Sequence, residues 1–374
     1  MMAPLDGLLV LDFSTLLPGP LATLMLAEAG AEIIKIERPG HGEDMRHAPP
    51  DWDGESLSFA LLNRGKKSLS LDLKSPEALE VLKPLIEKAD ILVEQFRPGV
   101  MGRLGLGYEE VKQINPKIIY CSITGYGQTG PKALAAGHDL NYMGDSGVLA
   151  TSTGPVDQPA VPPALIADVG GGTYPAVVNI LLALRKRDQT GKGCYIDIAM
   201  ADGAFAFSYW SFAKGAALGQ AIHNGKDRLT GGSPRYHLYP ASDGRTIAVG
   251  ALEQKFWEAF CQAINLAEPL RDDARNPEKS IAAVAEILLS KPSTHWKPIL
   301  EKADCCCTIV ANMDEVMDDA QYTERGVFNH SIKAAKGKSA PALPLPIIDK
   351  LRQSDSRVLP APKLGEHNRE FKLK

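Results

Sequence analysis

Short apolar runs alternate with amphipathic stretches along residues 1–200 of the chain. The apolar runs are bounded by Gly and Pro and have the length of buried strands, at 7–14, 31–39, 68–73, 90–96, 117–127 and 192–200. The stretches between them carry helix signals, at 20–30, 75–89, 107–115 and 168–188. This alternation predicts an α/β fold, in which a large domain holds a mostly parallel sheet with flanking helices.

The pattern changes after residue 220. Two alternating runs within 236–252 surround Asp243-Gly244 and predict a hairpin. Helical stretches follow at 255–264, 277–291 and 293–303, and the segment that begins with Cys305, Cys306 and Cys307 predicts a buried strand. We therefore expect a smaller α+β domain. The predicted boundaries are 1–205 plus 325–374 for the large domain, 206–224 for a linker and 225–324 for the small domain.

Three further segments bear on the class of protein. The apolar stretch 8–30 is interrupted by Asp12, Pro18 and Pro20, so it predicts a strand, a turn and a helix, and we expect no membrane span. The Gly-rich segment 99–107 lacks the GxGxxG spacing of a dinucleotide-binding loop. A long loop at 127–166, rich in Gly, Pro and Ser, is typical of a functional segment.

The composition excludes only a few classes of protein. The chain has 374 residues, of which 44% are hydrophobic and 23% charged, with a net charge of −4. These values are ordinary for a globular protein, and no cluster of Lys and Arg indicates a nucleic-acid partner. The six cysteines form neither CxxC pairs nor Cys/His metal spacings. We expect reduced thiols, a cytoplasmic location and no metal site.

Three side chains are candidates for acid–base chemistry: His138, Asp168 and Glu253. Each has a structural alternative, because His138 could be a core histidine, Asp168 a helix N-cap and Glu253 a solvated surface residue or another N-cap. The free N–H groups and dipole of a helix start would also stabilise an oxyanion beside Asp168. Gly170, Gly171 and Gly172 are poor helix formers, which indicates that another segment packs closely there. Sequence spacing does not show whether the three candidates meet.

Several motifs occur in a fixed order along essentially the whole chain: "LDFSTLLPGPLATLMLAEAGAEIIKIERPG", "NRGKKSLSLDLK", "LVEQFRPGVMGRLGLG", "SITGYGQTGP", "AGHDLNY", "IADVGGGTYPAVVNILLAL" and "LTGGSPRYHLYPASDG". Together they resemble the family III CoA-transferase superfamily, and within it the α-methylacyl-CoA racemases. Racemases of this group use a histidine in a GHD.NY motif, an aspartate 30 residues on and a glutamate after the DG hairpin. These positions fall on His138, Asp168 and Glu253.

Other features separate the two branches of the superfamily. Transferases keep the aspartate as a nucleophile but usually carry another residue at the histidine position. They also tend to have a longer glycine run in the small domain, where this chain has only "TGGSP". The segment 40–62 and Asn63 resemble transferases more, since many racemases are shorter there. The N-terminal part therefore fits either branch, whereas the catalytic positions fit a racemase.

The resemblance implies the interconversion of (R)- and (S)-2-methylacyl-CoA thioesters through an enolate. This reaction needs acid–base groups on both sides of one carbon, a role implied for His138 and Asp168. Glu253 would bond His138 and fix its tautomer. In the alternative, a family III CoA-transferase, Asp168 attacks the thioester and forms an aspartyl-acyl anhydride. A third class, a CoA-binding protein without catalysis, is disfavoured because the acid–base set is intact.

The resemblance further implies an acyl-CoA ligand, no other cofactor, and an interlocked homodimer in which Glu253 faces His138 of the partner, with Asp139 near that interface. Basic residues in loops of the first domain, where such ligands bind, are candidates for the CoA phosphates and adenine: Arg38, Arg64, Lys66, Lys67, Arg97 and Arg103. Arg97 and Arg103 match CoA-contacting positions of the family best. Gly137 and Tyr142 are expected at the substrate pocket, and Met200 either lines an apolar acyl surface or packs in the core.

Overall fold

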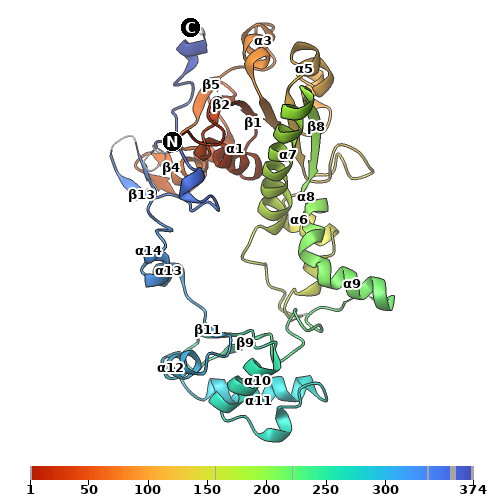
Figure 1. Ribbon diagram of the computed structural model, residues 1–374, viewed down its shortest axis with the longest axis vertical. Helices are drawn as coiled ribbons and strands as arrows, with labels where there is room; N and C mark the ends of the chain where they lie inside the picture. Colours follow the sequence, from red (N-terminus) through yellow and green to blue (C-terminus); the bar gives the residue numbers. More distant parts are fainter. Residues whose placement is uncertain (1, 156, 221, 335–336, 354–358, 372–374) are drawn as a thin grey trace. The chain divides into compact units, whose positions relative to one another are not determined.

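The central feature of the computed structural model is a six-stranded parallel sheet with the strand order β5-β2-β1-β6-β7-β8 (Figure 1). The model describes residues 2–155, 157–220, 222–334, 337–353 and 359–371. Every neighbouring pair in the sheet is parallel. The strands are β1 (Leu9–Phe13), β2 (Glu32–Glu37), β5 (Lys67–Ser70), β6 (Ile91–Glu94), β7 (Ile119–Thr124) and β8 (Cys194–Ala199). The predicted α/β class with a parallel sheet is confirmed.

The strand order places a topological switch point between β1 and β6. From β1 the chain moves outward through β2 to β5, then returns to the other side of β1 and continues through β6 and β7 to β8. At such a point the crossover connections diverge to opposite sides, which opens a crevice at the carboxyl ends of the strands. This edge is where the fold itself predicts a ligand site.

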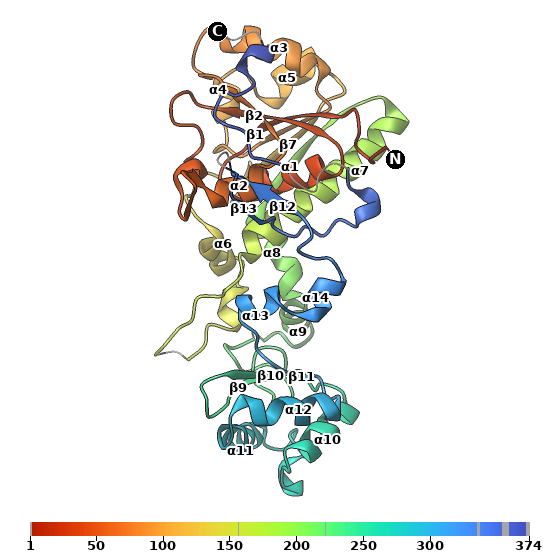
Figure 2. The ribbon, with the colours of Figure 1, turned by 90° about the vertical axis from the view of Figure 1, so that its left-hand side faces the viewer.

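Helices cover both faces of the sheet (Figure 2). On one face α3 (Ala78–Lys88) and α5 (Tyr108–Ile114) enclose a core with Leu11, Leu92 and Tyr120 of the strands. On the other face α7 (Tyr174–Thr190) packs against α1 (Pro18–Glu28) and against β7 and β8. Burial on both faces explains why the central strands are mostly apolar along their length instead of alternating between apolar and polar residues.

The chain divides into two compact units. The first unit comprises 1–146, 164–206 and 320–374, and the second comprises 147–163 and 207–319. These boundaries differ from those predicted, since 147–163 belongs to the second unit and the expected linker at 206–224 holds the helix α9 (Tyr209–Leu218). An exposed aromatic helix has no 3.6-residue apolar stripe, so the sequence pattern gave no sign of it.

The second unit is built on a small antiparallel sheet, in the order β11-β10-β9. Its strands β9 (His237–Pro240) and β10 (Thr246–Val249) form the predicted hairpin around Asp243 and Gly244. The strand predicted from the cysteine run is β11 (Cys307–Ile309), but its residues are partly exposed instead of buried. Three helices share its core: α10 (Gln254–Ala263), α11 (Pro277–Leu289) and α12 (Ser293–Ala303). All six cysteines are free thiols.

The segment 40–62 is ordered and packs against the C-terminal part of the chain. It forms η1 (Asp44–His47), the strand pair β3 (Asp51–Trp52) and β4 (Glu55–Ser56), and the start of α2 (Leu57–Asn63). Trp52 and Ala60 share a small core with Ile332, Ala334 and Ala342 of the returning chain. That chain forms the strand pair β12 (Ser331–Lys333) and β13 (Ser339–Pro341).

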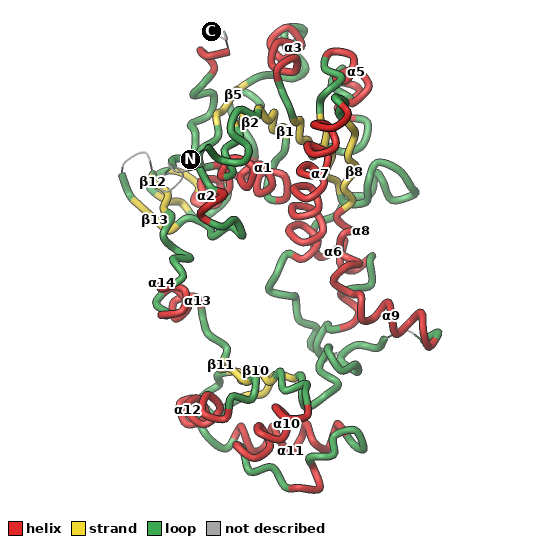
Figure 3. Tube along the Cα trace, viewed as in Figure 1, coloured by secondary structure: helices red, strands yellow, loops and turns green. Residues whose placement is uncertain are grey.

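The remaining elements are short, and Figure 3 shows them between long loops. They are α4 (Val100–Arg103), α6 (Asp139–Asp145), η2 (Leu149–Thr151), η3 (Ile166–Thr173), α8 (Met200–Ala204), η4 (Phe205–Ser208), η5 (Glu268–Leu270), α13 (Met313–Met317), α14 (Ala320–Glu324), η6 (Asp349–Leu351) and η7 (Asn368–Phe371). The predicted loop at 127–166 is therefore interrupted by α6 and η2.

One helical stretch, Ile166–Thr190, is long and apolar enough to cross a membrane by length and composition. Of its most apolar window, 44% is buried inside the protein. The core helix of a globular domain passes the same test, and this stretch packs on the sheet through α7. This helical stretch is therefore weak evidence for a membrane span.

Candidate functional site

Two adjoining cavities lie over the carboxyl edge of the parallel sheet. The first, of about 500 Å³, is lined by residues that follow β1, β6 and β7, together with His138 and Tyr142. The second, of about 570 Å³, is lined by residues that follow β1, β2 and β5. Thr15 and Phe96 line both cavities. Together they cover the switch point between β1 and β6, where a doubly wound sheet binds its ligand.

His138 lies at the wall of the first cavity, as the N-cap residue of α6. Its backbone is extended, and its N–H donates to the side-chain carbonyl of Asn141 at 3.1 Å. The imidazole is exposed, so His138 is not the core histidine that its sequence context allowed. The helix start fixes the backbone of His138 while leaving its ring open to the cavity.

Asp168 lies in the first turn of η3, a π-helix that continues directly into α7. The N-cap of η3 is Leu165, so the N-cap alternative for Asp168 is wrong. Single π-helical turns are rare and occur frequently at functional sites. Here the wider turn carries the half-buried carboxyl of Asp168 and contacts α6, the helix that His138 begins.

Asp139 joins the two helices. Its side chain is 6% exposed, and its Oδ1 accepts the backbone N–H of Ala167 at 2.7 Å and of Asp168 at 2.9 Å. Both amides at the entry of η3 are therefore occupied. The expectation that free N–H groups at this helix start stabilise an oxyanion does not hold for these two residues, because a buried carboxylate takes the place of the ligand.

Close packing explains two of the three glycines that follow Asp168. A Cβ on Gly171 would collide with the carbonyl oxygen of Met200, and a Cβ on Gly203 would collide with the backbone of Gly171. A Cβ on Gly172 would lie 2.9 Å from Cγ of Met200. The predicted close neighbour is thus α8, and the absence of side chains lets it touch η3 backbone to backbone.

The electrostatics of the site centre on Asp168. Burial, and then the negative charge of Asp139, raise the pKa of Asp168 to about 6, while His138 opposes the rise. The influence of His138 means that the two side chains lie within electrostatic range. Burial and the charge of Asp168 also raise the pKa of Tyr142, and Arg97 opposes that rise. A carboxyl with a pKa near neutrality is suited to take up and release protons at physiological pH.

Tyr142 forms a wall of the first cavity and is 7% exposed. Its hydroxyl donates to the carbonyl of Gly137, and its ring occupies the space where a Cβ of Gly125 or Gly137 would be. Tyr126 packs edge-on against it, with ring centroids 5.2 Å apart. Met200 lines the same cavity and is buried, so it packs in the core and also forms part of the cavity wall; a contact with an acyl chain stays a prediction.

Glu253 belongs to the second unit, whereas His138 and Asp168 belong to the first. It is the N-cap of α10, is exposed, and makes no capping hydrogen bond through its side chain. Its charge raises the pKa of the neighbouring Cys306 thiol, after the effect of burial. The structure therefore brings His138 and Asp168 near each other within the first unit, and Glu253 is an exposed residue at a helix start of the second unit.

The basic candidates divide into two groups. Arg97 is exposed and lines the first cavity, and Arg38 lines the second, where its Nε donates to the carbonyl of Gly42 at 2.8 Å and its guanidinium pairs with Asp44. Arg103 is exposed at the end of α4. These three arginines have guanidinium groups that solvent or a ligand can reach.

The other basic candidates are held by the protein. Arg64 is 1% exposed, and its guanidinium binds Glu28 and the carbonyls of Leu61 and Leu343. Lys66 is likewise buried and binds Asp12 at 3.1 Å. Neither can reach a ligand in this arrangement, because every donor faces an internal acceptor.

Lys67 lies at the amino end of β5, opposite the edge that holds the cavities. It forms ion pairs with Glu32 at 2.9 Å and with Glu370 at 2.7 Å. Like Arg64 and Lys66, it has a structural role here, although all three look like loop cations in the sequence.

Metal ligation has no evident location in this arrangement. Across the residues that the structure describes, no three His, Cys, Asp or Glu side chains gather so that they could hold a metal ion. The polar side chains near the cavities instead include His138 and Asp168 and the arginines at the cavity walls, Arg38 and Arg97.

Comparison with known proteins gives the family. The profile of CoA-transferase family III matches residues 5–368. The chain therefore belongs to the family III CoA-transferases, and it is an enzyme of this transferase and racemase superfamily.

The relatives carry names of both reaction types. Alpha-methylacyl-CoA racemase of Homo sapiens is 34% identical over 98% of this chain and 92% of its own length. Acetyl-CoA:oxalate CoA-transferase of Acetobacter aceti is 35% identical over 92% of this chain and 89% of its own length. A CAIB/BAIF family protein from Brucella suis has a crystal structure that is similar with a TM-score of 0.82, at 28% identity, over 100% of this chain and 99% of that one.

Proposed function

We propose that the protein is a racemase that interconverts (R)- and (S)-2-methylacyl-CoA thioesters. One observation carries the proposal: the exposed imidazole of His138 lines the first cavity, and the half-buried carboxyl of Asp168 lies within electrostatic range of it, on a turn whose backbone N–H binds Asp139, the residue after His138. A one-base enzyme would return the proton to the face from which it came. Inversion at a carbon needs an acid–base group on each face.

In the proposed reaction His138 takes the α-proton of one epimer, and the electron pair of the C–H bond moves into the thioester to form an enolate. Asp168, protonated at that moment, then donates a proton to the opposite face. The other epimer reacts in the reverse sense. The pKa of Asp168, raised to about 6 by burial and by Asp139, makes both of its protonation states accessible near pH 7.

The CoA part of the substrate fits the two cavities over the sheet edge. The nucleotide would lie over the ends of β2 and β5, near Arg38, and the thioester would reach the cavity of His138 past Arg97. Arginine is well suited to phosphate because its fork donates two parallel hydrogen bonds. The proposed chemistry uses no metal or redox cofactor, since CoA enters as part of the substrate.

A homodimer and a role for Glu253 are part of the proposal. The face of α7 that points away from the sheet exposes large apolar side chains, at Tyr174, Val178, Leu181 and Leu182. Apolar surface of this extent is typical of an interface, and a second copy of the chain would cover it. Glu253 of that copy would bond His138 and orient its ring. The free thiols of all six cysteines agree with a cytoplasmic enzyme.

A CoA-transferase is the second candidate, because relatives with that name are as similar to the chain as the racemases are. In this reaction the Asp168 carboxylate attacks the thioester, CoA leaves as a thiolate, and an acyl-aspartyl anhydride forms. The thiolate then attacks the aspartyl carbonyl of the anhydride, which releases the donor acid and leaves an aspartyl-CoA thioester. The acceptor carboxylate attacks this thioester to form a second anhydride, and CoA leaves again as a thiolate. The thiolate attacks the acceptor's carbonyl in that anhydride, which yields the new acyl-CoA and frees the Asp168 carboxylate. His138 has no chemical step in that sequence.

The test follows the α-proton. The protein is incubated with a 2-methylacyl-CoA in D₂O, without any acceptor acid, and the α-hydrogen and the ratio of epimers are followed by NMR and chiral chromatography. Exchange together with epimerisation is the expected result. Absence of exchange, with transfer of CoA to added oxalate, succinate or glutarate, would replace the racemase by the transferase.

A further inference from the structure

Leu16 has a backbone conformation that leucine rarely adopts. It follows β1 at the switch point, with φ of 62° in the left-handed region. Such a conformation is unfavourable for a residue other than glycine and persists only where the surroundings impose it. The Leu16 side chain is 37% exposed and lines the same cavity as His138.

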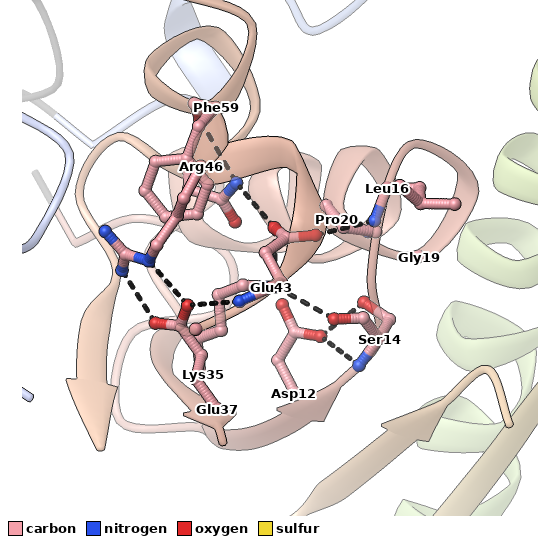
Figure 4. A network of polar contacts seen from close by, with 12 residues as sticks. Asp12, Ser14, Leu16, Gly19, Pro20, Lys35, Glu37, Glu43, Arg46 and Phe59 are labelled. Carbon is pink, nitrogen blue, oxygen red and sulfur yellow. Dashed lines mark hydrogen bonds and ion pairs between the residues drawn. The ribbon is translucent and has the colours of Figure 1, made fainter. Parts of the chain in front are cut away.

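The constraint on Leu16 comes from Glu43. The Oε2 of Glu43 accepts the backbone N–H of Leu16 at 2.6 Å (Figure 4). Glu43 is 27 residues away in sequence and lies in the segment 40–62, just before η1. This hydrogen bond forms in the left-handed conformation of Leu16, so the carboxylate stabilises that conformation.

Glu43 is itself held rigidly. It is 4% exposed and pairs with Nζ of Lys35 at 3.1 Å, and Nδ2 of Asn63 donates to it at 3.3 Å. Lys35 also donates to the carbonyl of Ser14 at 2.8 Å, two residues before Leu16 (Figure 4). One buried cation thus fixes both the loop and the carboxylate that holds it, and a buried paired carboxylate of this kind has little freedom to move.

The other end of the loop is fixed by a second buried pair. Lys66 binds Asp12 at 3.1 Å and donates to the carbonyl of Pro20 at 2.9 Å and to Asn63 at 2.9 Å. Asp12 accepts the N–H of Ser14 at 2.9 Å. Asn63 therefore links the two pairs, and the ends of the segment 14–20 are held while Leu16 points its side chain at the cavity.

We propose that Glu43 is a positioning residue that sets the acyl-group selectivity of the site by holding Leu16 in its left-handed conformation. The inference rests on the proposed function, since it concerns the acyl part of an acyl-CoA. It gives the segment 40–62 a purpose: the segment carries Glu43 into the buried network. If Glu43 no longer holds the loop, Leu16 relaxes to negative φ and its side chain leaves its place at the cavity wall.

The test uses a double-mutant cycle of Glu43→Ala and Leu16→Gly. Glycine adopts positive φ without strain and has no side chain to place. The readout is the ratio of kcat/KM for a short and a long-chain 2-methylacyl-CoA. Each single variant should change this ratio by about 10-fold, the scale of small changes in an apolar pocket. The double variant should show no further change, because without a Leu16 side chain Glu43 has nothing to position.

Three controls separate positioning from stability. Glu43→Gln keeps an oxygen that accepts the Leu16 N–H and should retain most of the wild-type ratio. Asp51→Asn, an exposed carboxylate of the same segment, should leave the ratio unchanged. If Glu43→Ala does not fold, Leu16→Gly alone decides, since a wild-type ratio in that variant contradicts the proposal. Equal loss of kcat/KM for both substrates, or additive effects in the double variant, would also overturn it.

Failure of the proposed function can be told apart from failure of this inference. If the wild-type protein exchanges no α-proton, the racemase proposal fails, and the same cycle is then measured by calorimetric binding of the short and long acyl-CoA thioesters. A change in binding preference with Glu43→Ala, lost in the Leu16→Gly background, supports the positioning role in either enzyme. An unchanged preference rejects it.

Discussion

The Oδ1 atom of Asp139 accepts the backbone N–H of Asp168 at 2.9 Å. The same oxygen accepts the N–H of Ala167, so a buried carboxylate at the start of α6 holds the entry of the π-helix η3. Because His138 is the residue before Asp139, this contact ties the two proposed acid–base groups to one rigid junction. Asp139 also raises the pKa of Asp168 through its charge, so it affects both geometry and protonation.

Replacing Asp139 by Asn tests these two effects together. The amide oxygen can still accept hydrogen bonds, but the negative charge is lost, so the pKa of Asp168 should fall toward its ordinary value. The acidic limb of the rate profile for the epimer that Asp168 deprotonates should move to lower pH. Asp139→Ala, which frees both amides, should lower kcat by about 10²-fold, as expected when reacting groups shift by about 1 Å. An unshifted acidic limb in Asp139→Asn would contradict the electrostatic role.

The wild-type pH profile should differ between the epimers. Asp168 must be ionised to act as a base, and burial and Asp139 raise its pKa to about 6. Its direction of proton abstraction should therefore lose activity as the pH falls through about 6, instead of through the ordinary range near 4. Initial rates of deuterium uptake from each pure epimer, measured from pH 4.5 to 8.5, check this. A common profile for both epimers would speak against two distinct bases.

Asp168 should also lower the stability of the protein at neutral pH. Its folded-state pKa lies above the unfolded value, so its contribution is favourable below the unfolded pKa and is lost as the pH rises through about 6. Asp168→Asn removes the titration. The Tm of this variant relative to wild type should be higher at pH 8 than at pH 5, while activity is lost. Thermal unfolding at the two pH values measures the difference, and a constant difference would exclude Asp168 as its source.

His138→Ala should affect the two epimers unequally. The epimer that His138 deprotonates should lose about 10²–10⁴-fold in exchange rate, the usual contribution of a general base. The opposite epimer can still be deprotonated by Asp168, but its proton returns to the same face, so exchange should continue without inversion. Deuterium uptake by NMR and chiral analysis of the product distinguish these outcomes. A CoA-transferase should tolerate His138→Ala better than Asp168→Ala.

Much of the fold could be predicted from the sequence because buried parallel strands have a recognisable sequence pattern, a short apolar run between turn residues. The runs that form β1, β2, β6 and β7 are buried on both faces, so they are mostly apolar, interrupted by single buried polar residues such as Asp12 and Lys35, and bounded by turns. The hairpin of β9 and β10 was equally visible from the alternation around Asp243-Gly244. The sequence pattern and the observed structure agree for elements whose burial is reflected in their own residues.

Elements that depend on contacts with distant segments of the chain could not be predicted from the sequence. The helix α6 inside the predicted loop has only a few buried residues and begins at His138, which is not a favoured N-cap. The π-helix η3 has no sequence signature of its own, so the sequence allows Asp168 as the N-cap, whereas the helix begins at Ile166 and its N-cap is Leu165, three residues before Asp168. The role of Asp139 required knowing that α6 touches η3, a contact between segments 28 residues apart.

The candidate site illustrates the same limit. His138, Asp168 and Glu253 were singled out by resemblance, whereas the residues that hold the loops, such as Gln95 and Glu43, were missed. Gln95 accepts the N–H of Gly19 at 3.0 Å and ties the loop after β6 to α1. A local sequence pattern does not predict this contact, because Gln95 and Gly19 are 76 residues apart.

Arg64 and Arg97 both look like loop arginines in the sequence. Replacing Arg97 should weaken substrate binding, whereas replacing Arg64 should lower the stability of the protein. Arg97→Ala removes an exposed guanidinium at the first cavity, so KM for acyl-CoA should rise several-fold with Tm unchanged. Arg64→Met leaves the carboxylate of Glu28 with one cation fewer in a buried site, so the free energy of unfolding should fall by about 3 kcal/mol. Steady-state kinetics and denaturant unfolding of both variants test the division. If the Arg64→Met variant has a raised KM and wild-type stability, Arg64 contacts the ligand and the assignment to a structural role is wrong.

Whether Glu253 orients His138 across the proposed homodimer can be tested with mixed dimers. His138→Ala and Glu253→Ala variants are each expected to be nearly inactive. If Glu253 serves the partner's His138, a hybrid of the two variants contains one site in which both residues are intact. Equal mixing after subunit dissociation should then restore about a quarter of the wild-type activity, since half of the dimers are hybrids and half of their sites are complete.

The same mixture gives no activity if Glu253 serves the His138 of its own chain, because each chain then carries one defect in its only site. A matched mixture of His138→Ala with Asp168→Ala supplies the control, since both residues belong to the first unit and no hybrid repairs them. Leu182→Glu, which places a charge on the exposed apolar face of α7, should yield monomers by light scattering and abolish the restoration. Restored activity in a monomeric preparation would contradict the shared site.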